Sequence, residues 1–241
     1  MPDRGSLRTR RHPVTRSARR PHCFLNVAVS LDGKVASVAR ELPSFPSAED
    51  RRVMDQIRAR SDAILVGGGT LRAADFPLRI RSRALQVRRL ASGRPEQPLN
   101  VLLSASLRVP LTGRFFSARD VKRLVVTSSA APKRLRERIR GSAEVLAWKG
   151  RWVSLRRLMN ELHRRGVREL LLEGGGATNF EFFRQGLVDE IYMTLCPLII
   201  GGAGSPTPVD GAGFPPELFQ RYLLVAMKRV RSEIYLHYRR D

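Results

Sequence analysis

The chain has 241 residues, of which 42% are hydrophobic and 27% charged, so it is long enough for one large α/β domain with an ample core. Its net charge of +22 predicts anionic partners such as phosphorylated metabolites, nucleotides or nucleic acid, although the arginine usage of a high-GC genome would produce the same charge. No apolar stretch approaches the roughly 18 residues of a membrane span. The two cysteines suit neither a disulfide framework nor a metal site, and they fit a reducing cytoplasm.

The N-terminal part of the chain divides into a tail and the start of a fold. Residues 1–20 are rich in arginine and lack an apolar segment, so we interpret them as a flexible basic tail, with an organelle transit peptide as the alternative. Residues 21–241 then form a single domain. A first strand over 22–30 leads into the turn 31–34, which places Lys34 just beyond a strand end. A solvated turn lysine would give the same pattern.

Two strands end in three consecutive glycines. The strand 62–66 precedes Gly67-Gly-Gly-Thr70, and the strand 170–172 precedes Glu173 and a second glycine triplet that leads into a helical pattern. Such a turn lets backbone N–H groups approach a phosphate, because glycine has no Cβ and a helix N-terminus carries partial positive charge. A tight turn that needs a positive φ is the alternative. Neither turn matches G-x-G-x-x-G, so a standard dinucleotide fingerprint is absent.

The remaining elements alternate between strands and helices. Residues 71–98 are rich in arginine and proline, and we expect an extended loop whose segment 76–81 could cover a ligand. A long strand over 189–200 carries Pro197, which favours a bulge or a sheet edge there. The pattern predicts one mixed α/β sheet without internal repeats. The other expected elements are strands at 99–103, 122–127 and 143–148, helices within 132–141 and 155–166, and a C-terminal hairpin of 223–230 and 233–238.

Five motifs resemble those of the pyrimidine reductases of riboflavin biosynthesis, in particular the stand-alone members. The similarity runs from about residue 21 to 240, and the motifs are Asn26–Lys34, Arg58–Thr70, Leu107–Pro110, Leu171–Gly176 and Gly186–Glu190. The resemblance implies a dihydrofolate-reductase-like α/β fold, with a mixed, mostly parallel central sheet flanked by helices. It also implies a cytoplasmic homodimer that uses NADPH to reduce the ribosyl group of a phosphoribosylamino-pyrimidine to a ribityl chain. These residues leave open whether that pyrimidine is aminated or deaminated.

The resemblance also implies roles for individual residues. Lys34 would polarise or protonate the ring oxygen of the ribose, and Glu173 would hold the substrate beside the path of the hydride. No metal is expected. The implied substrate-binding residues are Asn26, Ser30, Leu78 and Arg81, and the implied cofactor-binding residues are Thr70, Asp75, Ser104, Gly174, Gly175, Gly176 and Ala177.

The chain departs from the family pattern on the cofactor side. Ala74 stands where an acidic residue is usual, and Phe76 replaces a proline. Ser104 and Ser106 occupy positions that often carry an acidic residue and sometimes a lysine, so Arg108 could supply the cation for the 2′-phosphate of NADPH. Two alternatives therefore stay open: a paralogous reductase of another heterocycle, and a non-catalytic basic protein that binds nucleic acid on the same scaffold.

Overall fold

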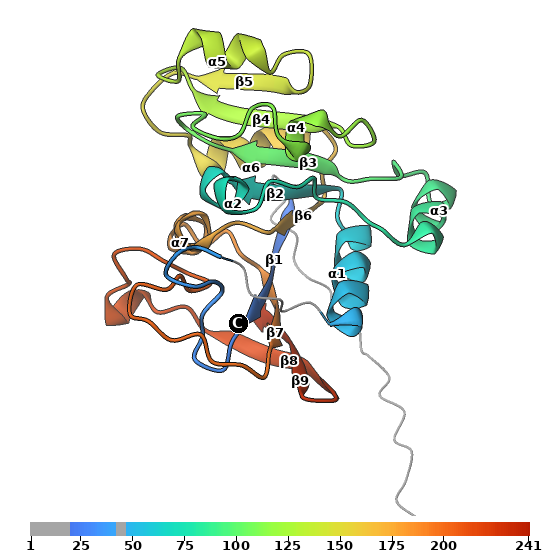
Figure 1. The fold of residues 1–241 in the computed structure, drawn as a ribbon, viewed down its shortest axis with the longest axis vertical. Helices are drawn as coiled ribbons and strands as arrows, with labels where there is room; N and C mark the ends of the chain where they lie inside the picture. The colour runs from blue at the N-terminus through green and yellow to red at the C-terminus, as the bar shows by residue number, and fades with distance from the viewer. Residues whose placement is uncertain (1–19, 42–46) are drawn as a thin grey trace, which may run out of the picture.

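The computed structural model describes residues 20–41 and 47–241, so residues 1–19 of the tail predicted over 1–20 lie outside this part. Its strands form one sheet in the order β5-β4-β3-β2-β6-β1-β7-β9-β8 (Figure 1). The strands are β1 His22–Val29, β2 Ala63–Gly67, β3 Leu99–Leu103, β4 Arg123–Ser128, β5 Glu144–Trp148, β6 Glu169–Leu172, β7 Glu190–Leu195, β8 Tyr222–Val230 and β9 Glu233–Arg240. The helices are α1 Ala48–Arg60, α2 Gly68–Ala73, α3 Arg83–Ala91, α4 Arg114–Ser117, α5 Lys133–Arg138, α6 Leu155–Arg164 and α7 Gly176–Arg184, with a 3₁₀ turn at Pro216–Leu218.

The sheet is mixed and mostly parallel, which confirms the predicted fold class. Along the sheet order, all neighbouring strands from β5 through β4, β3, β2, β6 and β1 to β7 pair in parallel. Strand β9 pairs antiparallel with both β7 and β8. From β2 the chain moves outward through β3, β4 and β5, and it returns through α6 to insert β6 between β2 and β1. The direction of winding therefore changes at β2, β6 and β1, which is where open α/β sheets bind ligands.

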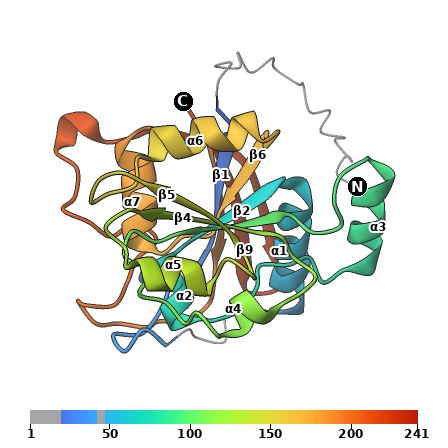
Figure 2. The ribbon, with the colours of Figure 1, turned by 90° about the horizontal axis from the view of Figure 1, so that it is seen from above.

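Helices cover both faces of the parallel part of the sheet (Figure 2). On one face, α6 presents Leu155, Leu158, Met159 and Leu162, and all four pack into a core cluster with strand residues and with α7. Their spacing of i, i+3, i+4 and i+7 places them on one stripe of the helix, as predicted. The opposite face has its own cluster, to which α1, α2 and α4 contribute apolar side chains.

The extended loop predicted for residues 71–98 is wrong, because this region contains the end of α2 and the whole of α3. In α3 a fully buried arginine takes the place that an apolar residue usually has. Arg89 is 1% exposed, and its guanidinium donates to the carbonyl oxygens of Pro95, Ala59 and Ser61 at 2.9, 2.9 and 2.6 Å. The prediction rested on the arginine and proline content of this region, but here one of the arginines faces inward as part of a helix.

The strand predicted over 189–200 ends at Leu195, so Pro197 lies beyond it and causes no bulge within it. The Leu198 N–H donates to the carbonyl of Cys196 at 2.8 Å, which turns the chain out of the sheet directly around the proline. The one register shift in the C-terminal hairpin falls between Leu224 and Ala226 of β8. The hairpin itself is confirmed.

Arg20 belongs to the folded domain, although the sequence analysis placed it in the tail. Its guanidinium binds both carboxylate oxygens of Asp189 at 2.7 and 2.6 Å, and the same aspartate accepts the Cys23 N–H at 2.8 Å. This pair ties the chain before β1 to the residue before β7.

Candidate functional site

Three neighbouring strand tips carry the residues expected to be functional. Because β2, β6 and β1 run in parallel and are adjacent in the sheet, their carboxyl ends lie at one edge. Lys34 follows β1, Glu173 follows β6, and Thr70 follows β2 in the first turn of α2. The structure thus brings these three residues to a common edge, as the strand-tip argument predicts.

The two glycine turns approach each other closely, and neither relies on positive φ. Among the described residues, glycines with positive φ lie elsewhere, for example Gly33 and Gly186. A β-carbon on Gly175 would lie 2.7 Å from Thr70 Oγ1, and one on Gly67 would collide with the side chain of Thr178. Gly67 and Gly175 are therefore required by close packing between the turns, and the alternative of a positive-φ turn is wrong.

A buried amide faces the second glycine turn. Asn179 in α7 is 1% exposed, and its Nδ2 donates to the carbonyl of Pro208 at 2.7 Å. Its Oδ1 accepts no hydrogen bond within the described residues, and a β-carbon on Gly174 would lie 2.8 Å from that oxygen. A buried acceptor without a donor is costly, so it marks a place where a ligand N–H group would be favourable. Asn179 was not among the site residues expected from the sequence.

The turn that carries Lys34 is built by side chains. Ser30 is fully buried, and its hydroxyl donates to Asp32 Oδ1 at 2.6 Å and accepts the Lys34 N–H at 2.9 Å. Asp32 also accepts the N–H groups of Ile200 and Gly201 at 3.1 and 2.8 Å. The hydrogen bond from Ser30, followed by those from the backbone, lowers the pKa of Asp32 to about 2. Ser30 is thus placed inside the turn, where it orients the backbone of Lys34.

Glu173 forms an ion pair with a buried arginine. The Arg58 guanidinium donates through Nε and Nη2 to the two oxygens of Glu173, each at 2.7 Å, and the side chains are 3% and 13% exposed. Its Nη1 donates to the carbonyl of Arg79 at 3.0 Å. Arg58 belongs to one of the five motifs but was not among the expected site residues. An arginine on the inward-facing stripe of α1 was the signal that could have identified it.

Side chains, and not a ladder of backbone bonds, hold the segment 78–82, which overlaps the segment 76–81 that was predicted to cover a ligand. Asn100 bonds the N–H and the carbonyl of Leu78 at 2.9 and 2.8 Å, and Gln97 bonds those of Ile80 at 2.8 and 2.9 Å. Asp55 accepts the N–H groups of Arg81 and Ser82 at 3.0 and 2.8 Å. The Leu78 side chain is 2% exposed and packs in the core, whereas Arg81 is exposed.

The other expected site residues have mixed surroundings. The Asp75 carboxylate accepts the N–H groups of Arg114 and Phe115 at 2.8 and 3.0 Å, so it caps the N-terminus of α4. Ser104 is 7% exposed and lies against Gly68 of the first glycine turn. Asn26 lies within β1 and is half-buried, whereas Ala177 in the first turn of α7 is exposed.

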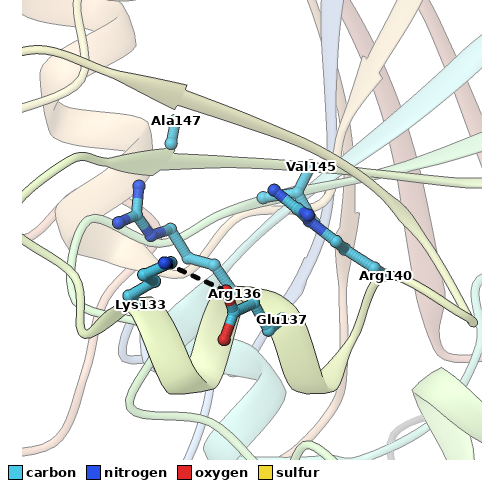
Figure 3. Close-up of a pocket in the computed structure, with 6 residues that line it drawn as sticks. All are labelled: Lys133, Arg136, Glu137, Arg140, Val145 and Ala147. Carbon is cyan, nitrogen blue, oxygen red and sulfur yellow. Dashed lines mark ion pairs between the residues drawn. The ribbon is translucent and has the colours of Figure 1, made fainter.

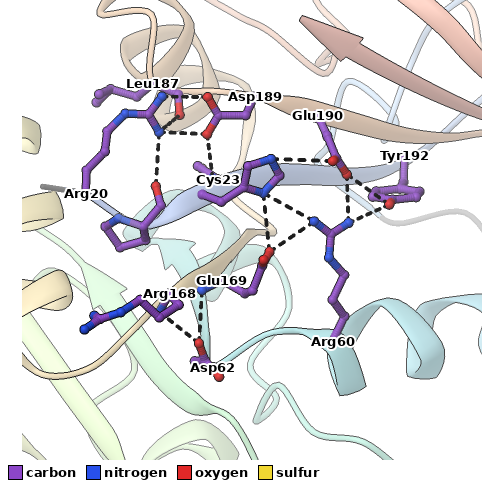
Figure 4. Close-up of polar contacts among 12 residues, drawn as sticks. Arg20, Cys23, Arg60, Asp62, Arg168, Glu169, Leu187, Asp189, Glu190 and Tyr192 are labelled. Carbon is purple, nitrogen blue, oxygen red and sulfur yellow. Dashed lines mark hydrogen bonds and ion pairs between the residues drawn. The ribbon is translucent and has the colours of Figure 1, made fainter. Parts of the chain in front are cut away.

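A second polar cluster lies at the amino ends of the strands, opposite the glycine turns (Figure 4). Arg60 donates to Glu190 and to the Tyr192 hydroxyl at 2.7 Å each, and its guanidinium lies 4.3 Å above the Phe24 ring. His22 approaches Glu190 at 3.5 Å. Burial raises the pKa of Glu190, but the hydrogen bonds from His237 and Arg60 outweigh it and hold that pKa well below its usual value.

Two surface hollows are lined by residues outside the two glycine turns. The smaller, of about 130 Å³, lies between α5 and the edge strand β5 and is lined by Lys133, Arg136, Glu137, Arg140, Val145 and Ala147 (Figure 3). It is below the size range of roughly 300–1,000 Å³ that is usual for small-molecule sites. The larger, of about 480 Å³, is an apolar groove that includes Phe180, Phe214 and Phe219. Neither contains Lys34 or Glu173.

None of the helices in the described ranges has the length and hydropathy that a bilayer span requires. Comparison with solved structures finds the same fold in a pyrimidine reductase-like protein from Corynebacterium diphtheriae, with a TM-score of 0.79, 23% identity and 92% of each chain covered. The same fold is present in RibD of Acinetobacter baumannii, with a TM-score of 0.75 and 22% identity over 92% of this chain and 58% of that one.

Sequence comparison finds nearer relatives. A protein of Archaeoglobus fulgidus is 41% identical over 195 residues, which cover 81% of this chain and 89% of the relative. One of Methanothermobacter thermautotrophicus is 36% identical over 194 residues, covering 80% and 86%. Both bear the name 2,5-diamino-6-ribosylamino-4(3H)-pyrimidinone 5′-phosphate reductase. The sequence model of the RibD C-terminal domain matches residues 21–235, and the chain belongs to that family.

Proposed function

We propose that this protein reduces the ribosyl group of 2,5-diamino-6-ribosylamino-4(3H)-pyrimidinone 5′-phosphate to a ribityl chain, with NADPH as the reductant. The observation that carries the proposal is the 41% identity to a relative of that name over 81% of this chain. The geometry supports it, because Lys34 and Glu173 lie at the shared edge where β1 and β6 end. Both of the relatives described above carry this diamino name, which favours the aminated over the deaminated pyrimidine.

A nicotinamide cofactor fits the residues at the second glycine turn. Gly174 and Gly175 lie directly before the N-terminus of α7, whose first backbone N–H groups would bind the pyrophosphate. The orphaned Oδ1 of Asn179 provides an acceptor for an N–H donor such as a carboxamide. Thr70 and Ala177 would complete the binding surface, with Asp75 and Ser104 acting through the packing around it. When bound, the cofactor would supply the hydride that reaches C1′ of the ribose.

The protein's own groups would manage the proton and the orientation of the substrate. Opening of the ribose leaves an imine at C1′ and needs a proton on the ring oxygen, which the Lys34 ammonium would donate. The turn built by Ser30 and Asp32 fixes the position of the Lys34 backbone, from which the side chain extends. Glu173 would accept N–H groups of the pyrimidine, and Arg81 would bind the 5′-phosphate.

The experiment is NADPH oxidation by the purified protein with each pyrimidine offered separately, at matched concentrations. We expect turnover with the diamino compound and at least a tenfold lower kcat/KM with the deaminated one. NADH serves as the control for the 2′-phosphate, where Arg108 replaces the cation of the family pattern. The paralogue alternative predicts turnover with neither pyrimidine. A nucleic-acid-binding protein would instead show affinity for RNA or DNA that falls steeply with salt.

The homodimer is part of this proposal. Strand β8 is the last strand of the sheet, and it exposes apolar side chains on consecutive residues and so on both faces: Leu223, Leu224 and Val225 are 53%, 53% and 48% exposed, and Met227 is 67% exposed. Exposed apolar edge strands favour pairing with another chain. The cytoplasmic location stays a prediction.

A further inference from the structure

Arg58 joins two parts of the proposed site that are far apart in the sequence. Through Nε and Nη2 it binds both oxygens of Glu173, and through Nη1 it binds the carbonyl of Arg79. At 3% exposure the guanidinium is removed from water, and its planar fork fixes the direction of each bond. One side chain therefore sets the position of the Glu173 carboxylate relative to the segment 78–82.

The segment at the other end of this connection is itself rigid. Asn100, Gln97 and Asp55 hold its backbone on both sides of Arg79, as described above. Arg81 is exposed, so its side chain starts from a fixed backbone and points outward. A carboxylate and a cation are thus held at a set separation by α1, which supplies both Arg58 and Asp55.

We propose that Arg58 is a positioning residue of the reductase, an inference that rests on the function proposed above. It orients the Glu173 carboxylate as an acceptor for N–H groups of the pyrimidine, while its bond to Arg79 keeps Arg81 at the distance of the 5′-phosphate. This arrangement selects an elongated substrate molecule that has N–H donors at one end and a phosphate at the other. The two glycine turns, which we propose to bind the cofactor, make no contact in this connection between Glu173, Arg58 and Arg79.

A matched control is available within the chain. Arg89 is also buried, at 1% exposure, but its guanidinium binds the backbone carbonyls of Pro95, Ala59 and Ser61 and makes no bond to Glu173 or to the segment 78–82. Loss of either arginine removes a buried cation, so both substitutions lower stability. Only Arg58 would change how the substrate is bound.

The test compares Arg58→Gln, Glu173→Gln, the double variant and Arg89→Gln, with rates normalised to the folded fraction and NADPH affinity measured by fluorescence. We expect Arg58→Gln to raise KM for the pyrimidine at least tenfold and to change NADPH affinity less than twofold, whereas Arg89→Gln leaves both unchanged. The double variant should lie within threefold of the worse single variant, because the two residues act as a unit. It leaves no buried charge unpaired, so it replaces Arg58→Gln if that variant does not fold.

The outcomes separate the two proposals. If the wild type turns over the pyrimidine and Arg58→Gln has an unchanged KM, or if the losses of Arg58 and Glu173 multiply, Arg58 is structural only and this inference is wrong. Where Arg58→Gln does not fold, a double variant more than tenfold worse than Glu173→Gln decides against it. A wild type that turns over neither pyrimidine overturns the proposed function, and this inference with it.

Discussion

Thr70 Oγ1 lies 2.7 Å from the point where a β-carbon on Gly175 would be, and the side chain of Thr178 occupies the corresponding point for Gly67. Each glycine turn therefore receives a threonine from the other. This reciprocal contact locks the tips of β2 and β6 together, and it places the N-terminus of α7 beside the start of α2. The geometry of the proposed cofactor surface depends on it.

We expect Gly175→Ala to displace Thr70 and to weaken NADPH binding by about tenfold or more, since a small-to-large change in a packed place typically costs about 1–3 kcal/mol. Fluorescence titration with NADPH measures the effect. Gly141→Ala is the control, because a β-carbon there meets nothing within 4 Å and its φ is not positive. Equal NADPH affinity in both variants would contradict the role of the interlocked turns.

Much of the fold could be predicted because hydrophobic patterning carries it. The buried strand 170–172 and the stripe on α6 are apolar at the required periods, and both were found. The helix α3 was missed because the arginine and proline content of 71–98 favoured an extended loop, whereas Arg89 of this helix occupies a core position. Patterning assigns such a residue to the surface, and only the three carbonyls that it meets in three dimensions explain its burial.

The site could be predicted only in part, for a related reason. Glycine triplets, Lys34 and Glu173 follow strand ends and are visible as motifs. Arg58 and Asn179 act through partners that are 115 and 29 residues away, so their importance depends on contacts that no local pattern encodes. Motifs reveal the strand tips, whereas the side chains that hold those tips in place emerge only from the packing.

Lys34→Ala should lower kcat by about 10²–10⁴-fold, the usual contribution of a positioned general acid. Its backbone bonds to Ser30 remain, so we expect the free energy of unfolding to change by only about 0.5 kcal/mol. Steady-state kinetics together with urea denaturation separate the two effects. Lys122→Ala, at an exposed position before β4, is the control. A large loss of stability with normal activity per folded molecule would refute the role in catalysis.

Leu224→Lys should shift the protein from dimer to monomer, because it places a charge in the middle of the exposed edge strand β8. Light scattering coupled to size exclusion measures the mass. Val87→Lys, at a position on α3 that is equally exposed at 50%, controls for the added charge. A wild type that is already monomeric at micromolar concentration would show that β8 has no partner of its own kind.

Removal of residues 1–19 should leave stability and turnover unchanged, whereas removal of residues 1–20 should destabilise the protein. The second truncation deletes the bidentate pair between Arg20 and Asp189, whose side chains are 24% and 21% exposed. A pair with this geometry contributes about 1 kcal/mol at a partly exposed position. Urea denaturation of the two truncated proteins and of Arg20→Ala measures the difference. Identical midpoints would show that the folded domain begins after Arg20.

The cluster at the amino ends of the strands predicts a pH-dependent stability. Burial alone lowers the pKa of His22, but the hydrogen bond to Glu169 and the charges of Glu169, Glu190 and Asp189 outweigh it, and the pKa is raised above 6.5. A raised pKa in the folded state contributes stability that is fully present below the unfolded value of about 6.5 and is lost as pH rises through the folded value. The pKa of Glu190 is lowered in the folded state, so its contribution to stability is constant above the unfolded pKa of about 4.5 and is lost only as pH falls below that value.

Denaturant unfolding of the wild type and of His22→Asn between pH 5.5 and 8.5 therefore isolates the histidine. We expect the wild type to be the more stable protein at pH 5.5 and to lose this advantage progressively towards pH 8.5, because the protonated ring is what binds the two glutamates at 3.3 and 3.5 Å. Parallel curves for the two proteins would mean that His22 binds no extra proton on folding. If the wild type instead gained stability relative to His22→Asn as pH rises, the neutral form of the His22 ring would be the stabilising one.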